Sequence, residues 1–178
     1  MGKEQKRNKV ILGQNFLTDK EIAKNIVDSC NFSESDHVVE IGPGEGILTE
    51  LIAGRVKSFT VIEIDSFYYN FIKGKAADFC KVKSGDADNK YGVFEVVNDD
   101  ALKFNYKSLS KKLNSKLRLI SNLPYEISSP IIDKFIKYKD AFSDLTLMFQ
   151  KEFAERLYSR ENDSQRGALS IIAGLNLM

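Results

Sequence analysis

The stretch His37–Glu50, HVVEIGPGEGILTE, decides the fold that this sequence predicts. Its first five residues form an apolar run with a single acid, which is typical of a short buried strand. The turn GPGEG (42–46) follows at once, and glycine there lets the backbone approach a ligand closely. The segment ILTELIAGRV (47–56) then has the pattern of a helix. Strand, glycine turn and helix in this order indicate one unit of an α/β fold.

Four more apolar runs are predicted as strands, with helix-like segments between them. They are FTVIEI (59–64), VFEVV (93–97), LRLIS (117–121) and LTLMF (145–149). Unbroken apolar strands that alternate with helices are typical of a parallel sheet covered on both faces. Since crossovers are right-handed, the prediction is a doubly wound, mainly parallel sheet. Such a sheet binds its ligand beyond the carboxyl ends of the strands.

The helix-like segments carry specific expectations about caps and buried faces. Thr18 is the expected cap of a helix at 18–30, with Glu21 as its capping-box partner. Ser129 is expected to cap a later helix that has Pro130 at its first position. The residues expected to face inward are Ile22, Ile26 and Cys30 in the first helix, and Phe67, Phe71 and Ile72 in a helix at 66–79. Further helices are predicted at 151–158 and 167–177, and a polar loop at 83–92.

Composition narrows the class of protein. A chain of 178 residues with 43% hydrophobic and 29% charged residues suits one soluble globular domain. No apolar run approaches the roughly 18 residues of a membrane span. The N-terminus has no secretory core, so a cytoplasmic location is expected, with an organelle as the alternative if a targeting peptide was trimmed. Cys30 and Cys80 are interpreted as reduced thiols and His37 as a structural residue, so no metal is expected.

Basic residues cluster in two places, although the net charge is only +1. The two clusters are Lys3, Lys6, Arg7 and Lys9, and then Lys103, Lys107, Lys111, Lys112, Lys116 and Arg118. They form either two solvated surfaces or two patches that contact the phosphates of a nucleic acid. Charge alone leaves both interpretations open.

Glycine and acidic residues follow three of the predicted strands, at the edge where this fold binds ligands. Gly42 and Gly44 follow the first strand, and Glu63 ends the second at a spacing suited to ribose hydroxyls. Asp100 follows the third, where a carboxylate can hold an adenine amine. These residues indicate an adenosine-containing cofactor. NAD and ATP are alternatives, but the chain has no G-x-G-x-x-G or P-loop lysine, and Glu45 would repel a pyrophosphate. S-adenosylmethionine, which is cationic and has no phosphate, suits the acidic edge better.

The stretch SNLPYEISSP (121–130) follows the fourth strand and carries almost no charge. The side-chain oxygen of Asn122 can accept a hydrogen bond from an amine, as can a main-chain carbonyl at Leu123 or Pro124, which turns the amine's lone pair toward a methyl group. Tyr125 offers a flat face on which a base removed from its helix can stack. These four residues form the predicted catalytic group, for methyl transfer to the amine of an extruded adenine.

Six motifs, in order, resemble those of the ribosomal RNA adenine dimethyltransferases, the KsgA and Erm group, and are closest to the KsgA branch. They are LGQNFLTD, VVEIGPGEGILT, VIEID, DDALKF, SNLPYEISSP and FQKEFAERL, from about Val10 onward. The resemblance implies a class I S-adenosylmethionine-dependent methyltransferase with a Rossmann-like fold. It also implies dimethylation of two adjacent adenosines of small-subunit ribosomal RNA on an assembling subunit. The full-length protein is expected to be monomeric.

The resemblance further implies the roles of individual residues. Asn15 and Leu17 would close over the cofactor, and Gln14 would border the target base. Gly42 and Gly44 would line the methionine end of the cofactor, and Glu63 would bind its ribose. Around the adenine of the cofactor the implied residues are Ile64, Asp100 and Ala101. Asn122 would bridge cofactor and target, and Tyr125 would stack on the target.

Members of this family continue beyond residue 178 with a phenylalanine-containing loop, a closing hairpin and a small helical domain. Residues 1–178 are therefore expected to form the cofactor-binding catalytic domain, with a flexible tail at 1–9 and the fold truncated before the hairpin. Such a chain is expected to bind S-adenosylmethionine and to methylate RNA poorly. One alternative is a non-catalytic assembly or transcription factor on the same scaffold. Another is an amine methyltransferase of DNA or protein glutamine, which has a similar Asn-Pro turn without GQNFL.

Overall fold

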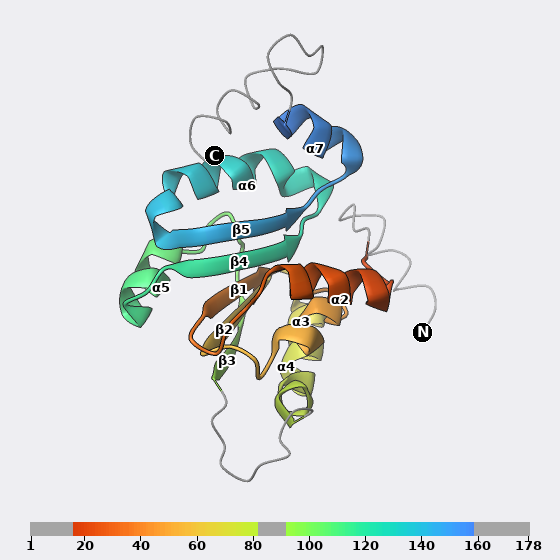
Figure 1. The fold of residues 1–178 in the computed structure, drawn as a ribbon, viewed down its shortest axis with the longest axis vertical. Coiled ribbons are helices and arrows are strands. Elements are labelled where there is room, and N and C mark those ends of the chain that lie inside the picture. Colours follow the sequence, from red (N-terminus) through yellow and green to blue (C-terminus); the bar gives the residue numbers. More distant parts are fainter. Residues whose placement is uncertain (1–15, 82–91, 159–178) are drawn as a thin grey trace. The chain divides into compact units, whose positions relative to one another are not determined.

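The computed structural model describes residues 16–81 and 92–158 (Figure 1). They belong to two compact units, each of which is described by itself. The sheet unit holds Phe16–Asn122 and Asp140–Leu147, and the helical unit holds Leu123–Lys139 and the described residues from Met148 onward. The interpretation of 1–178 as one catalytic domain with a tail at 1–9 stays a prediction.

A five-stranded sheet forms the centre of the sheet unit, in the order β3-β2-β1-β4-β5. The strands are β1 (His37–Ile41), β2 (Ser58–Glu63), β3 (Val93–Asn98), β4 (Leu117–Asn122) and β5 (Phe142–Met148). β1 pairs in parallel with both β2 and β4, and β2 pairs in parallel with β3. The predicted doubly wound, mainly parallel sheet is confirmed, and β5 begins three residues earlier than predicted.

The central strands β1 and β2 are buried along their whole length. Burial on both faces explains why their apolar residues run on without alternation. Two buried polar side chains of β1 have partners inside the unit. His37 Nδ1 lies 2.6 Å from Ser58 Oγ, and Thr49 Oγ1 donates to Glu40 Oε2 at 2.7 Å. The His37 ring therefore has the structural role that the sequence indicates.

Helices cover both faces of the sheet. They are α2 (Lys20–Ser29), α3 (Ile47–Ile52), α4 (Ser66–Lys81) and α5 (Tyr106–Leu113). The connections β1–β2 and β2–β3 run in one direction across the sheet, and the connection β3–β4 runs in the opposite direction. Because each crossover is right-handed, α3 and α4 lie on one face of the sheet and α5 on the other, as Figure 1 shows. Helix α5, which the sequence did not predict, is capped by Asn105, whose side chain accepts the N–H of Ser108 at 2.9 Å.

Helix α2 corrects two of the expectations. Its cap is Asp19 and not Thr18, because the Asp19 carboxylate accepts the N–H groups of Glu21 (2.9 Å) and Ile22 (3.0 Å). The buried face is partly different, because Cys30 is buried as expected whereas Ile22 is 50% exposed and Ile26 only half-buried. The buried side chains are Ala23, Val27 and Cys30. Helical spacing was therefore the right signal, but the prediction was one residue out of phase at Ile22 and Ile26 and right at Cys30.

In helix α4, Phe67 is the one residue that contradicts the predicted inward face. Phe67 is 54% exposed, whereas Ile72 and Phe79 are buried and Phe71 is half-buried. The helix begins at Ser66, where the Asp65 carboxylate accepts the N–H of Phe67 at 2.7 Å. Phe67 thus lies in the first turn, and the buried positions come later along the helix.

Gly74 in α4 is a site where the fold can be made more stable. It is exposed, and no atom of the described residues lies within 4 Å of the position that a Cβ would take. We expect Gly74→Ala to raise the free energy of unfolding by about 0.5–1 kcal/mol, because alanine loses less backbone freedom in a helix. Urea unfolding measures the change. Gly92→Ala is the opposite control, because its Cβ would lie 2.1 Å from the Val56 carbonyl oxygen. An unchanged or lower unfolding energy for Gly74→Ala contradicts the prediction.

The helical unit contains η1 (Tyr125–Ile127), α6 (Ser128–Lys137) and α7 (Lys151–Tyr158), and a further turn, η2 (Lys139–Ala141), leads to β5. Helix α7 has the predicted bounds. Helix α6 begins at Ser128, with Pro130 at its third position, so the expected Ser129 cap is wrong. Ser128 Oγ donates to the Pro124 carbonyl at 3.1 Å instead. The helix predicted at 167–177 and most of the loop predicted at 83–92 lie outside the described residues.

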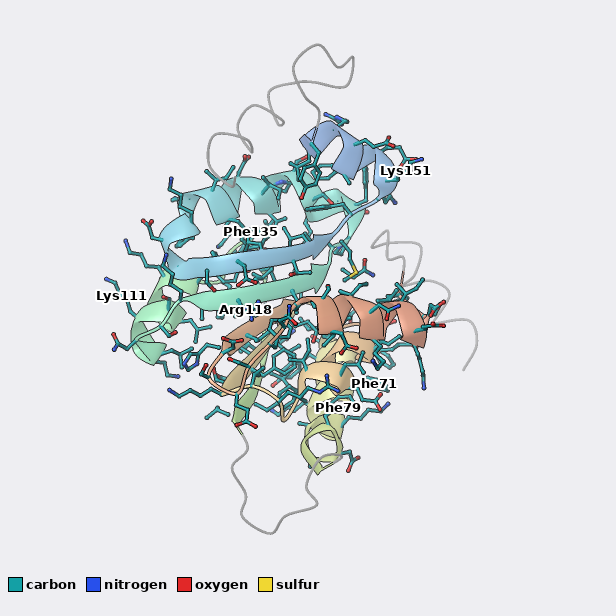
Figure 2. The ribbon with its side chains drawn as sticks, in the orientation of Figure 1. Phe71, Phe79, Lys111, Arg118, Phe135 and Lys151 are labelled. Carbon is teal, nitrogen blue, oxygen red and sulfur yellow. The ribbon has the colours of Figure 1, made fainter. Side chains whose placement is uncertain are left out.

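Arg118 on β4 joins three separate parts of the sheet unit, and Figure 2 labels it. Its Nε donates to Asp144 Oδ2 and its Nη1 to Asp36 Oδ2, both at 2.8 Å, and its Nη2 donates to the Cys30 carbonyl at 2.6 Å. Burial raises the pKa of Asp36, but hydrogen bonds from the Ser33 N–H and Arg118 outweigh it, so the pKa lies below its usual value. Arg118 is therefore no part of a solvated or phosphate-contacting surface, and that expectation is wrong for this residue.

Candidate active site

The glycine turn after β1 has a backbone that only glycine adopts easily. Gly42 has φ +64° and Gly44 has φ +54°, both in the left-handed region. Among the described residues nothing lies within 4 Å of a Cβ placed on Gly42, so this part of the chain leaves open space beside the backbone there. A Cβ on Gly44 would instead lie 2.6 Å from Cε1 of the Phe16 ring. One glycine thus leaves room for a ligand, and the other makes room for an aromatic ring.

Strand register brings four residues at the carboxyl ends of the strands into one row. Glu63 on β2 is paired with Asn98 on β3. Ile41 is the last residue of β1 paired with β2 and β4, so Gly42 comes level with both Glu63 and Asn122. Since neighbouring strands lie about 4.8 Å apart, Glu63 and Asn122 are about 10 Å apart, on either side of the glycine turn. We call Asn98, Glu63, Gly42 and Asn122 the rim row.

The Glu63 carboxyl is the acidic group of the rim row. It is 3% exposed, and its Oε1 accepts the N–H of Asp65 at 2.8 Å. Burial raises the pKa of Glu63, and backbone hydrogen bonds, chiefly from Asp65, oppose the rise. Asn98 holds the turn that follows, because its Nδ2 donates to the carbonyls of Glu63 (2.8 Å) and Ile64 (3.2 Å). Ile64 is 59% exposed, which leaves its side chain available to an adenine.

A second carboxyl lies beneath the glycine turn. Glu40 on β1 is 1% exposed, and its partner is the hydroxyl of Thr49 on α3. Burial raises the pKa of Glu40 to about 8, and the nearby charge of Glu63 adds to the rise. Glu40 is therefore largely protonated at neutral pH. Sequence reasoning did not assign it a role, although an acid inside an apolar strand is a visible signal.

Asp100 and Ala101 form a tight turn at the end of β3. Asp100 Oδ1 accepts the N–H of Leu102 at 2.8 Å, and Lys103 Nζ lies 3.7 Å from Asp100 Oδ2. Ala101 is 7% exposed, and its carbonyl accepts the hydroxyl of Tyr106 at 3.0 Å. The Asp100 carboxylate thus organises its own loop, and Tyr106 fixes the loop to α5.

The four predicted catalytic residues divide between the two units. Asn122 ends β4 and is half-buried beside Ser121, whose hydroxyl donates to the Ile41 carbonyl at 2.7 Å. In the helical unit, the N–H of Leu123 donates to the Met148 carbonyl at 3.2 Å. The Pro124 carbonyl accepts Ser128 Oγ and the N–H of Ile127. Of the two carbonyls predicted to grip an amine, that of Pro124 is engaged at the start of α6, and the Leu123 carbonyl remains the candidate.

Tyr125 and the GQNFL motif complete the predicted residues. Tyr125 is 55% exposed, as a stacking platform requires. Gln14 and Asn15 lie outside the described residues, and Leu17 is half-buried. Phe16, which the sequence did not single out, packs on Gly44 and lies 5.5 Å from the Tyr68 ring, centroid to centroid. The only feature of the sequence that pointed to Phe16 was its position between Asn15 and Leu17, two predicted cofactor residues.

Within 16–81 and 92–158, no three His, Cys, Asp or Glu side chains group as metal ligands do. No helix in this part of the chain has the length and apolar character of a membrane span.

The sheet order and the rim row define a doubly wound α/β domain of the class I methyltransferase type, and solved structures agree. A dimethyladenosine transferase from Plasmodium falciparum matches with a TM-score of 0.73 and 32% identity, over 90% of this chain and 52% of that one. The 23S ribosomal RNA methyltransferase ErmE matches with a TM-score of 0.61 and 28% identity, over 80% of this chain and 50% of that one.

Sequence comparison identifies the family. The family model for ribosomal RNA adenine dimethylase matches residues 5–176, so the chain belongs to that family. A relative from Francisella tularensis, ribosomal RNA small subunit methyltransferase A, is 40% identical over 161 residues, which is 90% of this chain and 57% of the relative. The chain thus spans a little over half the length of the curated relatives it matches. The resemblance inferred from the six motifs is confirmed.

Proposed function

We propose that this chain is the cofactor-binding and catalytic part of a ribosomal RNA adenine N6-dimethyltransferase. The observation that carries the proposal is the rim row, in which an acid, an open glycine backbone and a carboxamide come level at the carboxyl ends of β2, β1 and β4. Family membership and the names of the relatives support it. The proposed cofactor is S-adenosylmethionine, which supplies an activated methyl group on a sulfonium.

The residues present fit this cofactor. The open space over Gly42 admits a ligand against the backbone, and Gly42 and Gly44 would hold the methionine end. Glu63 would accept hydrogen bonds from the two ribose hydroxyls, a role that needs its carboxylate form. The exposed Ile64 would pack on the adenine, and Asp100 and Ala101 would meet the adenine edge. Gln14, Asn15 and Leu17 complete the proposed set.

Asn122 and its neighbours would orient the target. The amine of adenine is weakly nucleophilic because its lone pair is delocalised into the ring. The Asn122 side-chain oxygen and the Leu123 carbonyl would accept the hydrogens of the amine and turn the lone pair toward the methyl group. The exposed Tyr125, three residues after Asn122, would stack on the extruded base and replace about 1–3 kcal/mol of lost stacking. No side chain is required as a strong base, since the methyl donor is already activated.

The proposed substrate is a pair of adjacent adenosines of small-subunit ribosomal RNA in an assembling subunit. We place the reaction in the cytoplasm, or in an organelle with its own ribosomes, and propose a monomer. The alternative is a non-catalytic assembly or transcription factor on the same scaffold. Mass spectrometry of small-subunit ribosomal RNA incubated with an excess of the chain and S-adenosylmethionine separates them, because even the poor methylation expected of this chain produces N6,N6-dimethyladenosine and the alternative produces none.

Cofactor binding tests the assignment of Glu63. We expect Glu63→Gln to weaken the binding of S-adenosylmethionine by about 10- to 100-fold, because hydrogen bonds to a charged acceptor contribute roughly 1.5–3 kcal/mol each. Isothermal titration calorimetry measures the change. Glu50→Gln, at an exposed position of α3, is the matched control and should bind like the wild type. Equal affinities for all three proteins would overturn the ribose assignment.

A further inference from the structure

The outward side of α5 is strongly basic. Between Ala101 and Tyr125 the chain has six basic residues and no acid. Two of the six are already engaged, Lys103 with Asp100 and Arg118 with Asp36 and Asp144. The other four are exposed and take part in none of the ion pairs found among the described residues, and we call them the lysine face: Lys107, Lys111, Lys112 and Lys116. Figure 2 shows Lys111 at the outer end of α5.

The other side of α5 explains why the lysines point outward. Tyr106 is fully buried, and Leu109 and Leu113 are half-buried, at the i, i+3 and i+7 spacing of a helix packed on one side. Lys107 and Lys111 are four residues apart on the opposite side and are therefore neighbours. An ordinary solvated helix face would mix both signs of charge, and this one has only one.

Local helix energetics favour a different residue at position 107. Lys107 lies in the first turn of α5, where the helix dipole disfavours a positive charge. Its neighbour four residues on is also a lysine, and like charges at that spacing destabilise a helix. Helix stability accounts for Lys111 and Lys112, which lie in the last turn. It does not account for Lys107, and so a ligand for the cations is the better explanation.

We propose that the lysine face binds the phosphodiester backbone of the RNA substrate. This inference rests on the proposed function, because it supplies the contact that an RNA-modifying enzyme needs away from its acidic rim. Glu45, Glu63, Asp65, Asp99 and Asp100 all lie at the carboxyl ends of the strands and would repel RNA phosphates. The lysine face begins in the first turn of α5, where the Tyr106 hydroxyl ties the helix to the Ala101 carbonyl at that rim, and it ends at Lys116, just before β4 at the opposite edge of the sheet. RNA held on α5 is thus held at a fixed position relative to the rim row.

RNA binding by the full chain tests the inference. The variant Lys107→Gln with Lys111→Gln removes two charges from the lysine face. The probe is a transcript of the 3′ part of small-subunit ribosomal RNA, and its affinity is measured against salt concentration. Two lost phosphate contacts should reduce the slope of log affinity against log salt by about 1.4, which is about a 25-fold loss in 0.1 M salt. The matched control is Lys73→Gln with Lys75→Gln on α4, on the other face of the sheet, and it should bind like the wild type.

The outcomes separate this inference from the proposed function. If wild type and both double variants bind RNA with one affinity and one slope, the lysine face is only a solvated surface and the inference is overturned alone. If the wild type binds no RNA at all, the proposed function is overturned with it. Binding to phosphatidylserine vesicles in place of RNA would assign the cations to a membrane surface and would also overturn the inference.

A charge reversal at position 107 gives a second and independent readout. Lys107→Glu should raise the melting temperature by about 2 °C, because it suits the helix dipole and forms an i, i+4 pair with Lys111. The same variant should weaken RNA binding at least as much as a neutral residue does. Higher stability with weaker binding is the expected result. Higher stability with unchanged binding overturns the inference.

Discussion

Replacing Arg118 with alanine is expected to lower the free energy of unfolding by about 3 kcal/mol and the melting temperature by about 6–12 °C. The guanidinium joins carboxylates from two distant parts of the chain, Asp36 before β1 and Asp144 on β5, and also holds the Cys30 carbonyl. It lies 4.8 Å from the centre of the Phe32 ring as well. Alanine would leave two partly buried carboxylates close together without a cation, and it would remove the packing against Phe32.

Thermal and urea unfolding measure the effect, and Arg55→Ala is the matched control. Arg55 is also an arginine in an ion pair, but its contact with Asp28 is 3.9 Å long and both side chains are at least 40% exposed. Exposed pairs of this kind contribute about 0–1 kcal/mol. If the two variants lose the same stability, Arg118 does not hold the sheet unit together in the way the contacts indicate. Arg118→Lys should fall between them, since it keeps the charge and loses the planar fork.

Replacing Glu40 with glutamine is expected to change how stability depends on pH. Burial raises the pKa of Glu40 to about 8 in the folded chain, from the ordinary value of 4.5 that it has when exposed to water. Between these two pH values the unfolded chain has released this proton and the folded chain has kept it. Stability therefore falls as pH rises, by about 1.4 kcal/mol for each pH unit, and levels off above pH 8. Glutamine does not titrate, and its amide oxygen can still accept the Thr49 hydroxyl.

Urea unfolding between pH 4.5 and 8.5 measures the difference between wild type and Glu40→Gln, which cancels the titration of all other groups. The two proteins should be closest in stability at the acid end, and the variant should be more stable by several kcal/mol at the alkaline end. Glu50→Gln, at an exposed position of α3, should run parallel to the wild type. Parallel curves for Glu40→Gln as well would show that the buried carboxyl does not hold a proton at neutral pH.

The strands were predictable because their physics is local to the sequence. The bounds of β1, β2, β3, β4 and α7 each lie within one residue of the predicted bounds. A strand that is buried on both faces must be apolar throughout, so a run such as HVVEI has few other interpretations. The ends of the strands then fix the rim row by register. For this reason the sequence alone places Gly42, Glu63 and Asn122 at one edge of the sheet.

The remaining features depend on partners far away in sequence or on competition between near neighbours. Arg118 was grouped with surface lysines because its acidic partners lie 26 and 82 residues away. Helix α5 was missed because its lysines conceal the spacing of Tyr106, Leu109 and Leu113. At α2, Asp19 and Thr18 both suit a cap, and the carboxylate, the stronger acceptor, takes the position. Local pattern does not decide such cases, since long-range packing and small energy differences decide them.

The rim row of a nascent chain is complete only after translation has reached Asn122. β1 draws its two neighbours from segments 21 and 80 residues downstream, as the contacts His37–Ser58 and Ile41–Ser121 show. During synthesis β2 therefore follows early, whereas β4 and its carboxamide are made only after two-thirds of the present chain has been translated. Until then a growing polypeptide has the glycine turn and Glu63 but lacks Asn122, the residue on the other side of the turn.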